Sequence, residues 1–153
     1  MHQAGGVAVR NCATLSKLVS VAVAHAELES GDDLEALMGT MEGEPIYDLY
    51  PVGKRFQGME NTRRYYRYFF AEVQPRIQGF TPRSEAIGDQ GLVEEYDVVV
   101  LHPGESTPTT HRIIAILTFG QERLSGERMY SDDKLFKFLF GPLWNELTPI
   151  PAG

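Results

Sequence analysis

The sequence predicts an α+β domain in which helices come first and an antiparallel sheet follows. In the first half of the chain, apolar residues recur at spacings of three and four, and the period becomes strand-like after Pro82. Short turns separate the strand candidates, so neighbours in sequence are most simply antiparallel partners. Helices grouped before such a sheet are typical of the α+β class.

Length and composition indicate one globular unit. The chain has 153 residues, of which 42% are hydrophobic and 23% charged, close to the average of folded domains. We expect residues 13–153 to form this domain. Residues 1–12 contain a glycine pair and no periodic pattern, so we expect them to be a loose tail.

Charge and cysteine content argue against several classes of partner. The formal net charge of -7 disfavours nucleic acid, because an acidic chain repels phosphate. Residues 15–28 are apolar but are interrupted by polar residues, too short for a membrane span and unlike a signal peptide. Cys12 is the single cysteine, which fits a reducing compartment. The sequence therefore predicts a cytoplasmic protein that binds neither nucleic acid nor membranes.

Two helices are expected near the start of the chain. The apolar spacing from Thr14 onward predicts the first helix, which the polar residues 30–33 end. Asp32 or Asp33 then caps a second, short helix over residues 34–41 by accepting a free backbone N–H.

A strand and an aromatic helix come next. Residues 46–50 predict a short strand, and the Pro-Val-Gly sequence at 51–53 predicts a turn. A third helix begins near residue 58, carries aromatic side chains along one face and ends between Pro75 and Gly79.

Four strands are predicted in the second half, separated by turn residues. They cover residues 83–88, 92–101, 109–119 and 123–130. Asp132 or Asp133 then caps a last helix over residues 134–140, which Gly141 and Pro142 end.

Three passages, taken in order, carry a resemblance to a known family. They are a polar link at residues 29–37, a strand and glycine turn at 47–58 that runs into the pair Tyr65–Tyr66, and a strand closed by an aspartate at 127–132. This succession, over roughly residues 15–140, resembles the SnoaL-like polyketide cyclase branch of the nuclear-transport-factor-2-like superfamily.

The resemblance implies a cone-shaped, curved antiparallel sheet wrapped by three helices around an internal pocket. It further implies a hydrophobic small-molecule ligand, chemistry without a cofactor and a homodimer formed through the outer face of the sheet. The superfamily includes cyclases, ketosteroid isomerases, epoxide hydrolases, dehydratases and non-enzymatic binding modules, so the fold alone does not decide the function.

Asp132 is the first catalytic candidate. In SnoaL-like cyclases the aspartate at this strand end acts as a general acid/base in an aldol ring closure. Desolvation in an apolar pocket raises the pKa of a carboxyl group, which lets it exchange protons near neutral pH. The alternative is that Asp132 only caps the following helix.

Asp97 and His111 are the other catalytic candidates. Asp97 shares a strand face with Glu95, and Glu94 lies on the opposite face. Asp97 matches an aspartate of the superfamily's epoxide hydrolases, but Glu95 stands where those enzymes have an arginine, and two acids on one face are often solvated. His111 shares a face with the apolar residues 113–119 and can shuttle a proton or be purely structural.

The ketosteroid isomerase reaction is not expected. Those enzymes have an aspartate before the Pro-Val-Gly turn, where this chain has Tyr50, and an acid that donates to the oxyanion near the position of Ala115.

Aromatic and basic side chains are candidates for ligand contact, because a phenol in an apolar pocket can donate to a developing enolate. They are Tyr47, Tyr50, Tyr66, Phe69, Arg128 and Trp144. Tyr47 and Tyr50 are expected on opposite sides of their strand. The alternative is that the aromatic residues form core and that Arg128 forms a structural ion pair.

The sequence contains no metal-binding signature, since its four histidines lack ligand spacing. Two hypotheses remain. One is a cofactor-free acid/base enzyme of the cyclase or isomerase type, acting on a hydrophobic, carbonyl-bearing small molecule. The other is a non-catalytic protein that binds a small ligand or serves as a dimeric interaction module.

Overall fold

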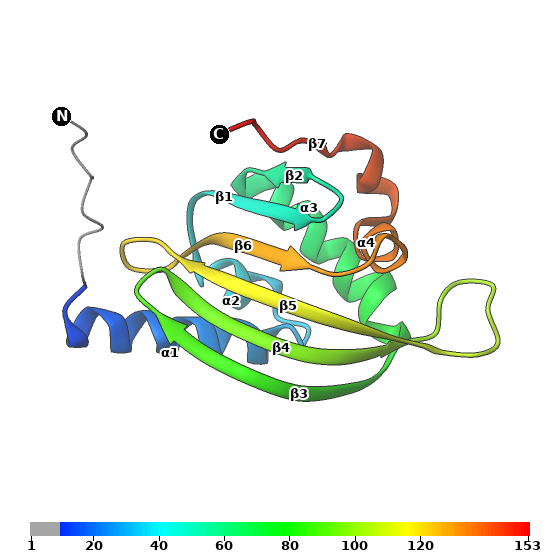
Figure 1. Ribbon diagram of the computed structural model, residues 1–153, viewed down its shortest axis with the longest axis horizontal. Helices are drawn as coiled ribbons and strands as arrows, with labels where there is room; N and C mark the ends of the chain where they lie inside the picture. Colours follow the sequence, from blue (N-terminus) through cyan, green and yellow to red (C-terminus); the bar gives the residue numbers. More distant parts are fainter. Residues whose placement is uncertain (1–9) are drawn as a thin grey trace.

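The computed structural model describes residues 10–153. In that range the strands form one seven-stranded sheet in the order β3-β4-β5-β6-β1-β2-β7. β6 and β1 run parallel, and the other neighbours run antiparallel. The strands are β1 Met41–Tyr50, β2 Lys54–Gln57, β3 Ile77–Gly88, β4 Gly91–Val100, β5 Thr109–Phe119, β6 Leu124–Tyr130 and β7 Thr148–Pro149. The predicted α+β class is confirmed (Figure 1).

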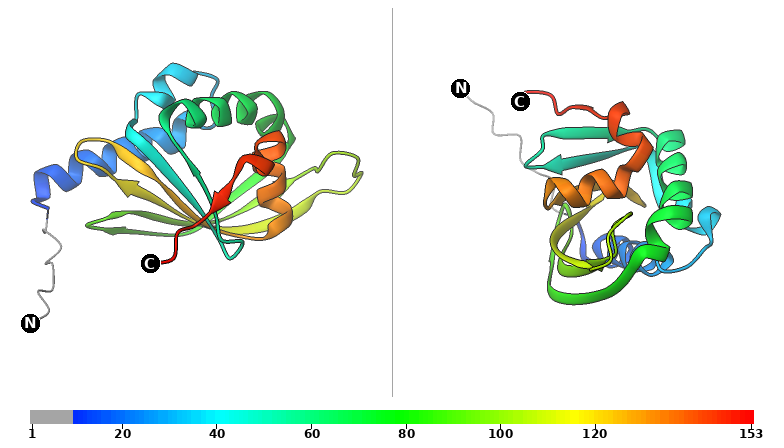
Figure 2. Two further views of the ribbon diagram at one scale, coloured as in Figure 1. Left: turned by 90° about the horizontal axis from the view of Figure 1, so that it is seen from above. Right: turned by 90° about the vertical axis from the view of Figure 1, so that its right-hand side faces the viewer.

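The sheet curls around the helices without closing into a barrel, as the expected cone requires (Figure 2). The helices of the described range are α1 Cys12–Leu28, α2 Leu34–Met38, α3 Met59–Tyr68 and α4 Asp133–Phe140. α1 and α3 lie on the concave side of the sheet, and α4 lies between the β1–β2 hairpin and the long strands β4 and β5. α3 continues into a π-helical turn over Phe69–Val73.

Short polar side chains begin three of the helices. Asn11 caps α1, Asp33 caps α2 and Asp132 caps α4, each accepting a hydrogen bond from a backbone N–H of the first turn. Two adjacent aspartates were candidate caps for α2, and two others for α4. In the structure Asp33 caps α2 and Asp132 caps α4.

Several predicted boundaries are wrong. The second helix ends at Met38 instead of residue 41, because β1 already begins at Met41 and carries Gly43 and Pro45 across a register shift. β3 begins at Ile77, before Pro82, since an edge strand tolerates a missing backbone N–H. The short strands β2 and β7 were not predicted. Most of the predicted tail, residues 1–9, lies outside the described residues, and Cys12 already belongs to α1.

Aromatic packing fills the cone beneath β1 and β2. α4 contributes five buried apolar side chains, which are Leu135, Phe136, Phe138, Leu139 and Phe140. The ring of Phe140 lies 4.8 Å from that of Tyr65 on α3 and 5.5 Å from that of Phe56 on β2, measured between centroids. These contacts hold α4 across the sheet and leave the space under β3, β4 and β6 to a cavity.

A β-bulge interrupts β6. Consecutive residues of β5 pair with Leu124 and Gly126, so Ser125 is an extra residue without a partner of its own. Gly126 has a φ of 141°, and a side chain there would overlap the carbonyl oxygen of Ile46 on β1. Only glycine fits this position.

The bulge decides which side chains of β6 face the interior. Leu124 is buried before it, and strict alternation would then turn Arg128 and Tyr130 inward. Because one residue is inserted, Glu127 and Met129 are buried instead, and Tyr130 is exposed.

Candidate functional site

A cavity of about 780 Å³ lies between the concave face of the sheet and the helices α1 and α4. Its volume falls within the range of small-molecule sites. Much of its wall is apolar and comes from the π-helical turn, β4, β5, β6 and α4. These wall residues include Phe69, Val98, Val100, Ile113, Met129 and Leu139.

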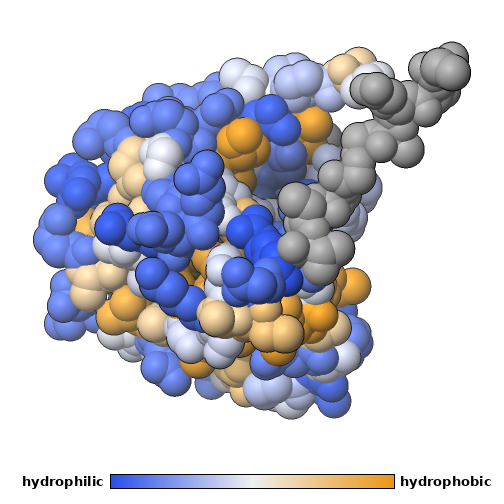
Figure 3. All heavy atoms as spheres, turned by 90° about the vertical axis from the view of Figure 1, so that its left-hand side faces the viewer, coloured by the Kyte–Doolittle hydropathy of each residue, from blue (hydrophilic) through white to orange (hydrophobic). Residues whose placement is uncertain are grey.

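The cavity reaches the surface between α1 and the edge strand β3. Val23 on α1 and Phe80 on β3 both line it, although they are 40% and 58% exposed. Apolar side chains gathered at the mouth of a groove are typical of ligand-binding or interaction sites. Seen from the end of the molecule where α1 begins, the surface is mostly hydrophilic, with hydrophobic residues showing in hollows between hydrophilic ones (Figure 3).

Glu127 places a carboxyl group in the cavity wall. Its residue is only 7% exposed, and the carboxyl accepts no hydrogen bond from any other residue of the described range. Burial raises its pKa well above 4.5, and the nearby carboxylates Glu29 and Glu94 raise it further. The protonated form of Glu127 is therefore favoured more strongly than that of an exposed glutamate.

β4 adds an acid and a phenol to the same wall. Glu94 and Tyr96 lie on the inner side of the strand, two residues apart, and both line the cavity. Burial raises the pKa of Glu94, as do the charges of Glu85 and Glu29. Burial also raises the pKa of Tyr96 well above 10.0, with contributions from Glu127 and the other two acids, so its hydroxyl stays a hydrogen-bond donor.

Glu29 stands at the rim and is fixed by a chain of hydrogen bonds. The Tyr66 hydroxyl donates to Glu29 at 2.8 Å and lies 3.0 Å from Nε2 of the buried His25. Nδ1 of His25 lies 2.7 Å from the Thr40 hydroxyl, which donates to the Leu37 carbonyl oxygen. Because the Thr40 hydroxyl donates its hydrogen to Leu37, it accepts the hydrogen bond from Nδ1 of His25.

No family model and no curated protein matches the sequence. Solved structures match it throughout most of its length. A protein described as a SnoaL-like polyketide cyclase from Jannaschia sp. CCS1 covers 87% of this chain and 98% of its own, with a TM-score of 0.67 and 9% identity. An NTF2-like protein from Anabaena variabilis ATCC 29413 covers 83% and 96%, with a TM-score of 0.62 and 13% identity.

A third match extends the comparison to a liganded structure. It is a protein of ketosteroid isomerase-like fold from Catenulispora acidiphila DSM 44928, in complex with trimethylamine, which covers 72% of this chain and 83% of its own at 17% identity and a TM-score of 0.56. The chain has the NTF2-like fold. At these identities the matches show the fold alone, which confirms the superfamily-level resemblance.

Two of the predicted catalytic residues lie outside the cavity of this NTF2-like fold. Asp132 caps α4 with its side chain 50% exposed, and Nδ1 of His111 lies 2.5 Å from its carboxylate. Burial alone raises the pKa of Asp132, but hydrogen bonds from His111 and Leu135 outweigh it and lower the pKa, opposite to the expected shift. Nε2 of the buried His111 meets Nε2 of His102 at 2.7 Å. A catalytic role for Asp132 or His111 stays a prediction.

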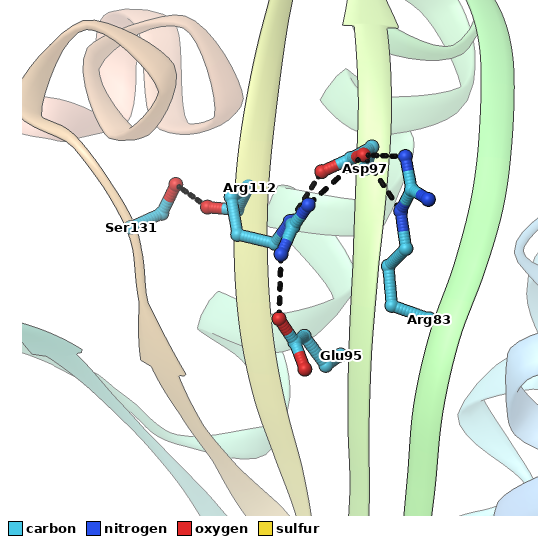
Figure 4. A network of polar contacts seen from close by, with 5 residues as sticks. All are labelled: Arg83, Glu95, Asp97, Arg112 and Ser131. Atoms are coloured by element: carbon cyan, nitrogen blue, oxygen red, sulfur yellow. Dashed lines mark hydrogen bonds and ion pairs between the residues drawn. The ribbon is translucent and has the colours of Figure 1, made fainter.

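The third predicted residue, Asp97, lies on the outer face of the NTF2-like sheet. It accepts hydrogen bonds from Arg83 and Arg112, which flank it, and Arg112 also binds Glu95 at 2.7 Å (Figure 4). These bonds, from Arg112 first and then Arg83, lower the pKa of Asp97 to about 2. Asp97 and Glu95 thus share a face, as predicted, and the lowered pKa keeps Asp97 ionised at neutral pH.

Three of the predicted ligand contacts belong to the interior. Phe69 lines the cavity. Tyr47 and Tyr66 lie behind the wall in the aromatic core and are each 1% exposed. The Tyr47 hydroxyl is buried without a hydrogen-bond partner in the described range. Their contact with a ligand stays a prediction.

The other three lie away from the cavity. Tyr50 stacks on Tyr130 at 5.1 Å, on the opposite side of β1 from Tyr47, as expected for a regular strand. Arg128 lines a shallow groove on the outer face of the sheet. Trp144 follows α4, and the ammonium group of Lys54 lies 4.8 Å from its ring centroid.

The sequence alone does not single out Glu94 and Glu127 as acids of the cavity. It places Glu94 on the face opposite Glu95 and Asp97, and it includes Glu127 only as the first residue of the strand at 127–132. A glycine inside a strand often marks a bulge, so Gly126 was the available signal that β6 changes its facing.

Two general features complete the description. In residues 10–153 we find no group of three or more His, Cys, Asp or Glu side chains arranged to hold a metal ion. Within the same range, no helix has the length and apolar character needed to cross a membrane.

Proposed function

We propose that the protein is a cofactor-free acid/base enzyme that moves a proton on a hydrophobic small molecule bound in the cavity, with Glu127 as the acid/base. One observation carries the proposal. Glu127 is a buried carboxyl group in the cavity wall, without a hydrogen-bond partner in the described range and with a raised pKa. Buried carboxyl groups held in this condition are concentrated at sites of proton transfer.

The chemistry follows from two proton-bearing groups that line the same cavity. Ring closure and isomerisation at a carbonyl compound both require a group that removes a proton from carbon and a donor that stabilises the oxygen as it becomes negative. Glu127 in its ionised form supplies the first. Tyr96, whose high pKa keeps its hydrogen in place, supplies the second.

The solved relatives support a small organic ligand, since one of them was obtained in complex with trimethylamine. The apolar wall is consistent with a hydrophobic ligand. A cytoplasmic location and a homodimer formed through the outer face of the sheet remain predictions. A monomeric mass in solution would contradict the latter.

The test uses 5-nitrobenzisoxazole, a neutral aromatic probe that reports proton removal by a carboxylate. The base takes the hydrogen from carbon, the N–O bond breaks, and a coloured cyanophenolate forms. We expect a saturable rate that falls by about 100-fold or more in Glu127→Gln. The rate rises with pH as Glu127 ionises, with a midpoint above the ordinary value of 4.5.

Glu146→Gln is the control, because Glu146 is an acid that does not line the cavity and whose carboxylate is bound by Arg64. It should keep the rate of the unchanged protein. Equal loss in both variants, or no loss in Glu127→Gln, would refute the proposal. Saturable binding of the probe without any Glu127-dependent rate would favour the alternative, a non-catalytic ligand-binding protein with the same apolar cavity.

A further inference from the structure

The cavity wall is rich in acidic side chains and poor in basic ones. Six glutamates line it, which are Glu27, Glu29, Glu85, Glu94, Glu95 and Glu127. Among the lining residues of the described range, Arg83 is the one basic side chain, and its guanidinium group binds Asp97 on the outer face. This positive charge is thus already paired with a carboxylate on the outer face.

Among these acids, Glu127 is buried and lacks a hydrogen-bond donor. The residue is 7% exposed and lines the cavity, and no described residue donates a hydrogen bond to its carboxyl group. Glu29, in contrast, accepts from Tyr66. A buried carboxylate without a cation or donor is costly, and folded proteins normally supply one. Here the missing partner has room to arrive as a ligand.

The aromatic side chains of the cavity are suited to the same kind of ligand. The rings of Phe80 and Tyr96 lie 4.8 Å apart between centroids, on the neighbouring strands β3 and β4, and both line the cavity. The faces of such rings attract organic cations. The aliphatic wall formed by residues such as Val98 and Ile113 accommodates the carbon substituents of the same molecule.

We propose that the cavity selects a hydrophobic organic cation, such as a substituted ammonium ion, whose charge lies near Glu127 and whose substituents contact Tyr96, Phe80 and the apolar wall. This names the substrate class of the site and rests on the proposed function for the role of Glu127. A neutral carbonyl compound, as implied by the resemblance, would leave the acids of the cavity unpaired.

Binding of a cation should expel a proton from the protein. Without a ligand, burial and the neighbouring acids raise the pKa of Glu127 and so favour its protonated form. A cation beside it reverses this balance and favours the ionised form. The substrate would then generate the base that acts on it. The titratable groups whose charges interact with Glu127 are Glu29, Glu94, Tyr47, Tyr65, Tyr66 and Tyr96. His25 lies one step further away, 3.3 Å from the carboxylate of Glu29.

The test is calorimetric titration of the full chain with benzyltrimethylammonium and with N,N-dimethylbenzamide, a neutral compound of similar size. We expect the cation to bind at least about 10-fold more tightly. The binding heat at neutral pH should depend on the ionisation heat of the buffer, in the direction of proton release. Glu127→Gln should abolish the preference and the proton release, whereas Glu146→Gln, outside the cavity, should retain both.

Glu94→Gln is a second variant, and it should weaken the preference without abolishing proton release. Equal or tighter binding of the neutral compound, no binding of the cation, or a preference that survives in Glu127→Gln would overturn the proposal. The two proposals fail separately. Loss of cation selectivity with an intact Glu127-dependent rate on 5-nitrobenzisoxazole refutes this inference alone, and cation selectivity without that rate refutes the enzymatic proposal alone.

Discussion

Acidic residues on the two faces of the same sheet have pKa values shifted in opposite directions. Asp97 on the outer face and Glu127 on the inner face are almost equally covered, with 8% and 7% of each residue exposed. Asp97 is covered by two arginine side chains that are themselves about half exposed, and its pKa is lowered to about 2. Glu127 is covered by the protein interior, and its pKa is raised.

The difference shows that two acids with equal coverage have opposite pKa shifts when one has cationic partners and the other has none in the described range. Asp97 has two permanent cations and therefore one stable protonation state. Glu127 has none in the described range, so its charge can change when a ligand arrives. Three predictions would break or sharpen this contrast.

The largest effect on stability is expected at the glycine that sets the direction of Glu127. Gly126→Ala introduces a side chain at a φ of 141° and against the carbonyl oxygen of Ile46. We expect a loss of about 3 kcal/mol in the free energy of unfolding, measured by urea denaturation. The control Gly88→Ala, where a Cβ meets nothing within 4 Å, should change it by about 0.5 kcal/mol or less. Equal losses would mean that the bulge is not the constraint.

The second prediction concerns the opposite pH dependences of the two acids. Glu127 has a raised pKa in the folded state, so its contribution to stability is present below 4.5 and declines as the pH rises through its folded pKa. Asp97 has a lowered pKa, so its contribution is present above 3.8 and is lost as the pH falls toward about 2.

Denaturation midpoints across this range separate the two effects. Glu127→Gln should flatten the decline on the alkaline side, where Glu94 leaves a smaller slope of the same sign. Asp97→Asn should flatten the decline on the acid side. If Glu127→Gln has its effect on the acid side instead, the carboxyl is not held in its protonated form.

The smallest effect is expected at Asp132, where two roles can be separated. Asp132→Ala removes the cap of α4 and should cost about 1 kcal/mol, whereas Asp132→Asn retains a good cap and should cost much less. With Glu127 as the acid/base, Asp132→Asn keeps the rate on 5-nitrobenzisoxazole within about twofold. A loss as large as that in Glu127→Gln would return the catalytic role to Asp132.

The fold was largely predictable from the sequence because periodicity and turn residues report local structure directly. The predicted strand at residues 109–119 coincides with β5, and the opposed directions of Tyr47 and Tyr50 were also predicted. Alternation along β4 grouped Asp97 with Glu95 and set Glu94 apart. Alternation shows which residues share a face of the strand, but it does not show which of the two faces lies on the concave side of the sheet.

The candidate site was harder to predict because it depends on contacts between distant segments. Asp97 became an outer-face residue through Arg83 and Arg112, which come from the strands on either side of β4. Glu127 faces the cavity because the β-bulge at Ser125 shifts the alternation of β6 by one residue. Neither fact is visible in the spacing of residues along one strand.

The bulge at Ser125 sets the sign of the side chain that β6 turns into the cavity wall. If Ser125 were drawn into the regular pleat, alternation from Leu124 would turn Arg128 and Tyr130 inward in place of Glu127 and Met129. A guanidinium group would then occupy the wall where a carboxyl group now lies. Two neighbouring residues of opposite charge thus compete for one position in the wall, and the backbone at Gly126 decides between them.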